Sequence, residues 1–357
     1  MEYHPAYHIM LREGIEAGIS AAAWSGVQGG HVLHAALELL LAEVEPSVCC
    51  PITMTYAAPA ALKHQPDVAQ GWLPKIVGRK YDAASRPAGE KQGVTIGMAL
   101  TESRAARMCR QHDARRGDGR RQLPAYRPQM VLFGADVGCV SDARLRDRRP
   151  HLLSRAALDP DGKRNGIHIM RLKDKVGDRA NASSEIEYHG AHTVRIGEKG
   201  RGVATILEMV HHTRPRLRDR TGEAYMRSAS PRRCGTPRIG GPSAKRLIEQ
   251  PLMRHVLADL AIESEASTAL ASRVARSFDE AAGERRSGPL LSRIATPVAK
   301  YYLNKRVAGH VAECMECHGG AGYVEEWPIA RLYRQAPLNG IWEGSSKRDL
   351  SPTCCAR

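Results

Sequence analysis

The stretch Cys317-His-Gly-Gly-Ala-Gly-Tyr323 places a glycine-rich turn near the end of the chain, and Arg331-Leu-Tyr-Arg334 and Ile341-Trp-Glu-Gly-Ser345 follow it. Glycines let a backbone approach a diphosphate closely, although the same spacing alone is also typical of a plain helix end. Glu343 is a candidate base, because burial in a desolvated pocket raises the basicity of a carboxylate. A lone Trp-Glu-Gly-Ser is usually a surface turn. The two preceding motifs favour a functional site here.

The composition is that of a large globular protein. The 357 residues are 42% hydrophobic and only 5% aromatic, and they can bury the cores of two or three domains. Nine scattered cysteines indicate reduced thiols. No apolar run is long enough to span a membrane, and the start Met1-Glu-Tyr-His-Pro5 lacks the pattern of a signal peptide. We therefore expect a cytoplasmic protein without membrane contact.

The net charge of +15 is concentrated in three segments. Residues 103–157, 215–244 and 347–357 carry the whole excess, mostly as arginine, and the rest of the chain is neutral. A basic chain suggests nucleic-acid binding when its basic residues line one face or one helix. None of the three segments shows helical or strand periodicity. The charge therefore gives little support for a nucleic-acid site.

Apolar periodicity predicts helices first, then strands, then helices again. Ala35–Val44 has an apolar face at helical spacing that Pro46 ends, and a second helix opens at Cys49. Val94–Glu102 begins like a strand and runs into a turn. The other expected elements are strands at 166–171 and 184–188 and helices at 203–210, 247–278 and 297–314.

This order of elements and motifs resembles the acyl-CoA dehydrogenase family, and the wording Trp342-Glu-Gly-Ser345 resembles its AidB (alkylation-response) branch. Further matching blocks are Cys50-Pro-Ile-Thr-Met-Thr55, Gly97-Met-Ala-Leu-Thr-Glu102, Arg171 to Glu185, and Gly200 to Arg214. The resemblance implies an α+β fold with three domains. These are an N-terminal helical domain at 1–95, a β-domain at 96–196 and a C-terminal helical bundle at 197–346, followed by an aberrant tail at 347–357.

The resemblance also implies an FAD enzyme that dehydrogenates the Cα–Cβ bond of an acyl-CoA thioester. Glu343 would take the α-proton and flavin N5 would accept hydride from Cβ, while the protein supplies orientation. A homo-oligomer is implied, a tetramer in this family, in which the glycine loop meets the FAD of a neighbouring subunit. The residues implied at the cofactor are Leu100, Thr101, Glu102, Gly319, Gly320, Gly322, Ile341, Trp342, Gly344 and Ser345.

The arginine-rich segments depart from the family. After Thr101-Glu102 the family continues Lys-Gln-Gly-Gly-Ser-Asp, but this chain continues Ser103-Arg-Ala-Ala-Arg107. The family has a Gly-His-Lys-Trp-Phe-Cys-Ser strand where this chain has Tyr126 to Cys139. If suitable codons for this stretch are read one base later, they give the family's sequence. We interpret 103–157, 215–244 and the tail as out-of-frame translation, in a chain that starts inside the family's first domain and stops before its last helices. We expect a depleted sheet, no buried helix across 215–244 and impaired activity.

Two other functions stay open. The AidB branch is associated with DNA protection, so one alternative is a DNA-binding alkylation-response protein, and another is a non-functional fragment. The basic run between Arg171 and Arg179 would suit a phosphate of CoA or DNA, but a solvated loop is the commoner origin of such a run. Cys314-Met-Glu-Cys-His318 fits a haem-attachment pattern, which requires export, so we interpret it as helix packing. We expect no metal site, because no second ligand pair has suitable spacing.

Overall fold

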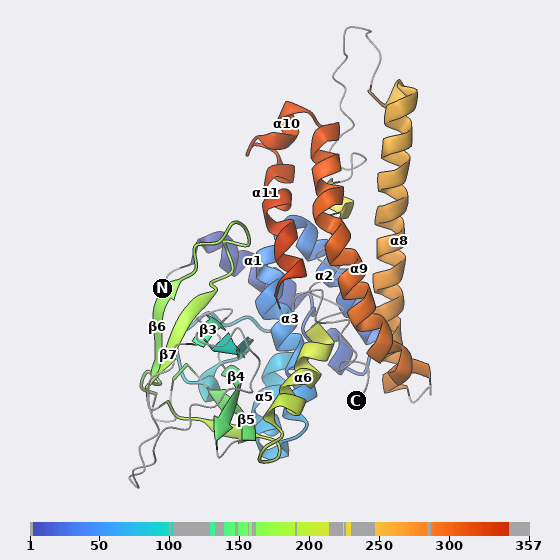
Figure 1. Ribbon diagram of the computed structural model, residues 1–357. Coiled ribbons are helices and arrows are strands. Elements are labelled where there is room, and N and C mark those ends of the chain that lie inside the picture. The colour runs from blue at the N-terminus through green and yellow to red at the C-terminus, as the bar shows by residue number, and fades with distance from the viewer. Residues whose placement is uncertain are drawn as a thin grey trace. The chain divides into compact units, whose positions relative to one another are not determined.

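The computed structural model describes residues 3–99, 101–102, 129–132, 139–146, 149–155, 157–158, 162–189, 191–213, 224, 226–229, 247–283 and 287–342. The chain divides into two compact units, whose elements are labelled in Figure 1. The first unit comprises Met1–Ser25, Cys50–Lys175 and Arg179–His212. The second comprises Gly26–Cys49, Val176–Asp178 and Thr213–Arg357. The domain limits predicted after residues 95 and 196 both fall inside the first unit.

Short helices make up much of the first unit. They are α1 (Pro5–Glu16), η1 (Ala22–Trp24), α3 (Cys49–Ala57), α4 (Pro59–Leu62), α5 (Pro66–Val77), η3 (Ala88–Glu90) and α6 (Gly202–Thr213), where η marks a 3-10 helix. Proline begins α1, α4 and α5, where the missing N–H would have no helical partner in any case. Every residue of α3 is buried, so α3 is a core helix rather than a surface helix.

Two four-stranded sheets complete the first unit. One has the order β1 (Ile96–Ala99), β4 (Cys139–Arg146), β5 (Arg149–Arg155) and β8 (Val194–Ile196), with β1 and β4 parallel and the other pairs antiparallel. The other is antiparallel, in the order β2 (Thr101–Glu102), β3 (Gln129–Leu132), β7 (Ser184–Tyr188) and β6 (Ile167–Leu172). In the first sheet β1 is therefore an edge strand.

Three of these strands, β3, β4 and β5, lie within 103–157, where the sequence shows no strand periodicity. Strand pairing uses backbone N–H and C=O groups, which every residue except proline carries in full. Antiparallel neighbours such as β4 and β5 can therefore pair without a regular alternation of side chains. The periodicity argument could not predict strands of this kind.

Helices of very different lengths make up the described part of the second unit. They are α2 (Gly30–Val44), η2 (Pro46–Val48), η5 (Leu247–Glu249), α8 (Pro251–Ala282), α9 (Ser287–Cys317), α10 (Gly320–Tyr323), α11 (Pro328–Gln335) and η6 (Ala336–Gly340). The helices α8 and α9 pack along each other (Figure 1). Asp279 of α8 accepts hydrogen bonds from the backbone N–H groups of His31 and Val32, at 2.8 and 3.0 Å, and so caps the start of α2. No helix in the described part of the chain is long and apolar enough to cross a bilayer.

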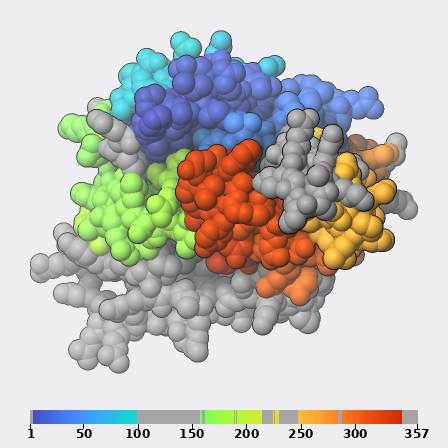
Figure 2. All heavy atoms as spheres, turned by 90° about the horizontal axis from the view of Figure 1, so that it is seen from above, coloured from blue at the N-terminus to red at the C-terminus, as the bar shows by residue number. Residues whose placement is uncertain are grey.

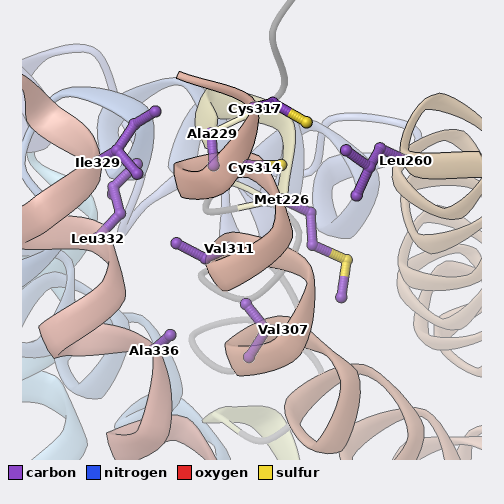
Figure 3. Close-up of a cluster of buried hydrophobic side chains, with 10 residues drawn as sticks. All are labelled: Met226, Ala229, Leu260, Val307, Val311, Cys314, Cys317, Ile329, Leu332 and Ala336. Atoms are coloured by element: carbon purple, nitrogen blue, oxygen red, sulfur yellow. The ribbon is translucent and has the colours of Figure 1, made fainter. Parts of the chain in front are cut away.

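A buried cluster in the second unit joins α9 and α11 with residues of α8, η6 and 226–229 (Figure 3). Val307, Val311 and Cys314 share one face of α9 at helical spacing, and each is fully buried. The ten buried members are Met226, Ala229, Leu260, Val307, Val311, Cys314, Cys317, Ile329, Leu332 and Ala336. This cluster holds in place the end of α9, from which the glycine turn begins.

The expectation that no buried helix runs across 215–244 falls mostly outside the described residues, and residues 226–229 are the main part that is described. These residues are helical, and Met226 and Ala229 are fully buried in the cluster just described. The local reason is that Met226 and Ala229 lie three residues apart, which places both on one helical face despite the arginines nearby. The rest of 215–244, apart from Ala224, lies outside the described residues.

Candidate functional site

The glycine turn leaves α9 with an open backbone. Nδ1 of His318 donates to the carbonyl of Cys314 at 2.7 Å and closes the last turn of the helix. Gly319 then takes φ +58°, a left-handed conformation that favours glycine. A Cβ added to Gly319 or Gly320 would meet no atom within 4 Å. Figure 2 shows part of the red C-terminal segment at the surface on this face, and both Gly319 and Gly320 are exposed.

Gly322 has a different role from its two neighbours. A Cβ added there would lie 2.4 Å from the carbonyl oxygen of Met315 and 3.1 Å from Cβ of His318. Glycine at this position is therefore needed to pack α10 against the end of α9. Its sequence spacing alone had suggested the same ligand-binding role for all three glycines.

The Arg331-Leu-Tyr-Arg334 motif anchors α11. Arg331 donates to Oε2 of Glu45 at 2.7 Å and to the carbonyl of Val44 at 3.0 Å, which places a cation at the carboxyl end of α2. Leu332 lies in the core, and Arg334 forms a two-pronged pair with Glu325 in the turn after α10. This motif therefore positions the segment that precedes the predicted base.

The described chain ends just before the predicted base, at Trp342. After η6, Ile341 is 64% exposed and Trp342 is half-buried. Residues 176–178 pack on the end of α11, where a Cβ added to Gly177 would lie 2.7 Å from Cγ of Gln335. The predicted site residues Glu343, Gly344, Ser345 and Leu100 lie outside the described residues.

The predicted flavin loop lies in the first unit, whereas the glycine turn lies in the second. Thr101 pairs with Met130 and Glu102 pairs with Gln129, so both residues form the edge strand β2. The convergence of this strand with the glycine turn and Glu343 on one pocket stays a prediction.

Asp82 organises the loop that leads into β1. Its carboxylate accepts hydrogen bonds from the N–H groups of Ala84 and Gln92, both at 3.0 Å, and from Arg86 at 2.7 Å. Burial alone would raise the pKa of Asp82, but the donors from Gln92, Arg86 and Ala84 outweigh it and lower the pKa from 3.8 to about 2. The ionised carboxylate therefore closes the loop between α5 and the sheet.

We expect Asp82 to make the unfolding free energy depend on pH in the acid range. Because its pKa is lower in the folded state, its contribution is present above pH 3.8 and is lost as the pH falls towards 2. Chemical denaturation between pH 5 and pH 2 measures this slope, and Asp82→Asn should flatten it. An unchanged slope in Asp82→Asn would contradict the assignment.

The basic run after β6 is engaged within the chain. Arg171 forms two hydrogen bonds with Glu185, at 2.8 and 2.9 Å, and Lys173 contacts the same carboxylate. The hydrogen bond from Arg171, followed by that from Lys173, lowers the pKa of Glu185 to about 2. Lys175 donates to the carbonyl of Asn181 and the hydroxyl of Ser183. These contacts favour a structural loop over a phosphate site.

A cavity of about 250 Å³ lies at the start of α6, and none of the predicted catalytic or cofactor-binding residues lines it. Glu208 in its wall pairs with Lys63 at 2.6 Å and with His64 at 2.9 Å. Burial raises the pKa of Glu208, but these two neighbours outweigh it and lower the pKa. The wall also includes Arg201 and Thr205. The charges here compensate one another, and no sequence motif indicated this cavity.

The Cys314-x-x-Cys317-His318 pattern is part of the packed end of α9. Both cysteines are buried, and burial raises the pKa of Cys317. Among the described residues no group of three histidine, cysteine or acidic side chains is arranged to hold a metal ion. Both cysteines are packed within the end of α9, and the interpretation of the pattern as helix packing stays a prediction.

Comparison with known families identifies the chain. Residues 1–83 match the adaptive response protein AidB N-terminal domain, and residues 200–351 match the acyl-CoA dehydrogenase C-terminal domain. The AidB protein of Escherichia coli K12 is 36% identical over 351 residues, which are 97% of this chain and 64% of that protein. The chain belongs to the acyl-CoA dehydrogenase family. It spans just under two thirds of the length of this relative.

Solved structures agree with this acyl-CoA dehydrogenase fold. Caenorhabditis elegans ACDH-11 in complex with C11-CoA superposes with a TM-score of 0.82 at 23% identity, over 99% of this chain and 61% of that chain. An acyl-CoA dehydrogenase from Bacillus anthracis complexed with FAD superposes with a TM-score of 0.74 at 16% identity, over 96% and 60% of the two chains. At these identities the likeness shows the fold alone.

Proposed function

We propose that this acyl-CoA dehydrogenase homologue is built for FAD-dependent α,β-dehydrogenation of an acyl-CoA thioester. The observation that carries the proposal is the open glycine turn at Gly319 and Gly320, within the region that matches the acyl-CoA dehydrogenase C-terminal domain. A backbone with no side chain in front of it is what close approach to a diphosphate requires. The relatives with CoA and FAD bound support the same chemistry.

Bound FAD supplies the two-electron acceptor that this reaction needs. The residues of the chain bind and orient, and one of them moves a proton. When FAD is bound, Gly319 and Gly320 would hold its diphosphate through their backbone, and the segment with Thr101 and Glu102 would hold the flavin edge. Glu343, which follows Trp342 directly, takes the α-proton of the thioester.

The chain as written is proposed to perform this function poorly. Ser103-Arg-Ala-Ala-Arg107 stands where the family has the Gly-Gly-Ser-Asp loop, and arginine-rich sequence replaces the Trp-Phe-Cys-Ser strand. Each lost hydrogen bond to a flavin or phosphate costs about 1–3 kcal/mol, so several lost together weaken a tight site to weak or negligible binding. A chain with the family's reading frame restored across 103–157 and 215–244 should regain the site.

Titration with FAD tests this proposal directly. We expect the purified chain to show no flavin absorbance and weak FAD binding, and the frame-restored chain to bind FAD stoichiometrically. Stoichiometric FAD in the chain as written would contradict the predicted impairment. Absence of FAD binding by the frame-restored chain would contradict the proposed function itself and favour a fragment without cofactor.

A further inference from the structure

Among the described strands, β1 lies at the edge of its sheet and pairs with β4 alone. In a parallel ladder the N–H groups of alternate residues point to opposite sides, so half of the donors of β1 face away from β4. These donors need other partners, because a buried unpaired N–H is costly. The helix α3 supplies them on this side of the strand.

Two side chains of α3 receive the edge of β1. The N–H of Ile96 donates to Oγ1 of Thr55 at 2.9 Å, and the N–H of Met98 donates to Sδ of Met54 at 3.3 Å. Thr55, Met54 and Ile96 are each at most 2% exposed, and Met98 is 7% exposed. A thioether is a weak acceptor. The hydroxyl of Thr55 is therefore the stronger of the two attachments.

The hydroxyl of Thr55 has a fixed direction. It donates its proton to the carbonyl of Pro51, one turn earlier in α3, at 2.7 Å. Because the proton is committed to Pro51, a lone pair of the same oxygen is left to accept the N–H of Ile96. Thr55 thus joins the core helix to the strand by one donated and one accepted hydrogen bond.

This contact lies close to the predicted flavin loop. The strand β1 ends at Ala99, and Thr101 and Glu102 follow after one residue. A strand advances about 3.3 Å per residue, so a slip of β1 on α3 would move the loop by a comparable distance. We propose that Thr55 is a positioning residue that fixes β1 on α3 and thereby sets Thr101 and Glu102 for FAD, an inference that rests on the proposed function.

Three variants test the proposal. Thr55→Val keeps the shape and loses the hydroxyl, Thr55→Ser keeps the hydroxyl, and Thr268→Val is the matched control. Thr268 of α8 makes the same bond to a carbonyl one turn earlier, that of Ser264 at 3.0 Å, and it lies within a long helix rather than beside β1. Amide hydrogen exchange of Ile96 is measured in each full-length chain, and FAD affinity is measured in the frame-restored form at a temperature where all variants are folded.

We expect Thr55→Val to speed exchange at Ile96 about tenfold or more and to weaken FAD binding about tenfold, with recovery in Thr55→Ser and no change in Thr268→Val. Unchanged exchange at Ile96 in Thr55→Val would overturn the proposed contact. Faster exchange with unchanged FAD affinity would overturn the positioning role alone. A frame-restored chain with Thr55 intact that binds no FAD would overturn the proposed function, and with it the role of Thr55.

Discussion

Glu343→Gln is expected to lower the dehydrogenation rate of an acyl-CoA substrate by about 10²–10⁴-fold in the frame-restored chain, because an amide cannot take the α-proton. Glutamine keeps the size of the side chain, so FAD binding should persist. The bleaching of flavin absorbance on mixing with acyl-CoA thioesters of different chain lengths measures the rate. Thioesters of several lengths are needed, because the sequence does not specify the acyl chain.

A nearby glutamate serves as the control for this experiment. Glu326 is exposed in the turn between α10 and α11, only 17 residues before the predicted base. Glu326→Gln removes one negative charge from the same region and should leave the rate unchanged. A full rate in Glu343→Gln, or an equal loss in both variants, would rule out Glu343 as the base.

Gly322→Ala is expected to lower the free energy of unfolding by about 1–3 kcal/mol, because the added methyl group would lie 2.4 Å from the carbonyl oxygen of Met315. Gly322 belongs to α10 and the Met315 carbonyl belongs to α9, so the backbone of one of these helices would have to move to relieve this overlap. Urea denaturation of the purified chain, followed by circular dichroism, measures the change. A loss below about 0.5 kcal/mol would show that α10 can shift away from α9 at little cost.

Gly320→Ala is the matched control, because a methyl group there would meet no atom within 4 Å. We expect its stability to stay within about 0.5 kcal/mol of the parent. In the frame-restored chain the same variant should weaken FAD binding if the open turn receives the diphosphate. The pair therefore separates the packing role of Gly322 from the binding role proposed for Gly320.

Much of the helical architecture could be predicted from spacing in the sequence. The apolar run at Ala35–Val44 lies within α2, Cys49 opens α3, and the strands expected at 166–171 and 184–188 correspond to β6 and β7. Amphipathic periodicity reports which residues share a face, and that face is what a helix buries. The strands β3, β4 and β5 escaped prediction because they lie in arginine-rich sequence without alternation.

The family and its motifs could also be established from the sequence, because the order of the glycine turn, the arginine pair and the Gly-Ser turn is a property of the chain alone. What each member of a motif does was decided by the tertiary structure. Spacing could not separate Gly320, which faces open space, from Gly322, which faces the carbonyl of Met315.

Contacts between distant segments were likewise decided by the fold. Arg331 reaches Glu45 across 286 positions, and Thr55 reaches Ile96 across 41. A hydrogen bond depends on two atoms lying within about 3 Å in space, whereas a sequence pattern reports only neighbours on one helix or strand. The sequence by itself therefore determined the family and most of the helices. Only the tertiary structure decided which side chains from distant segments meet, because sequence patterns do not report distances in space.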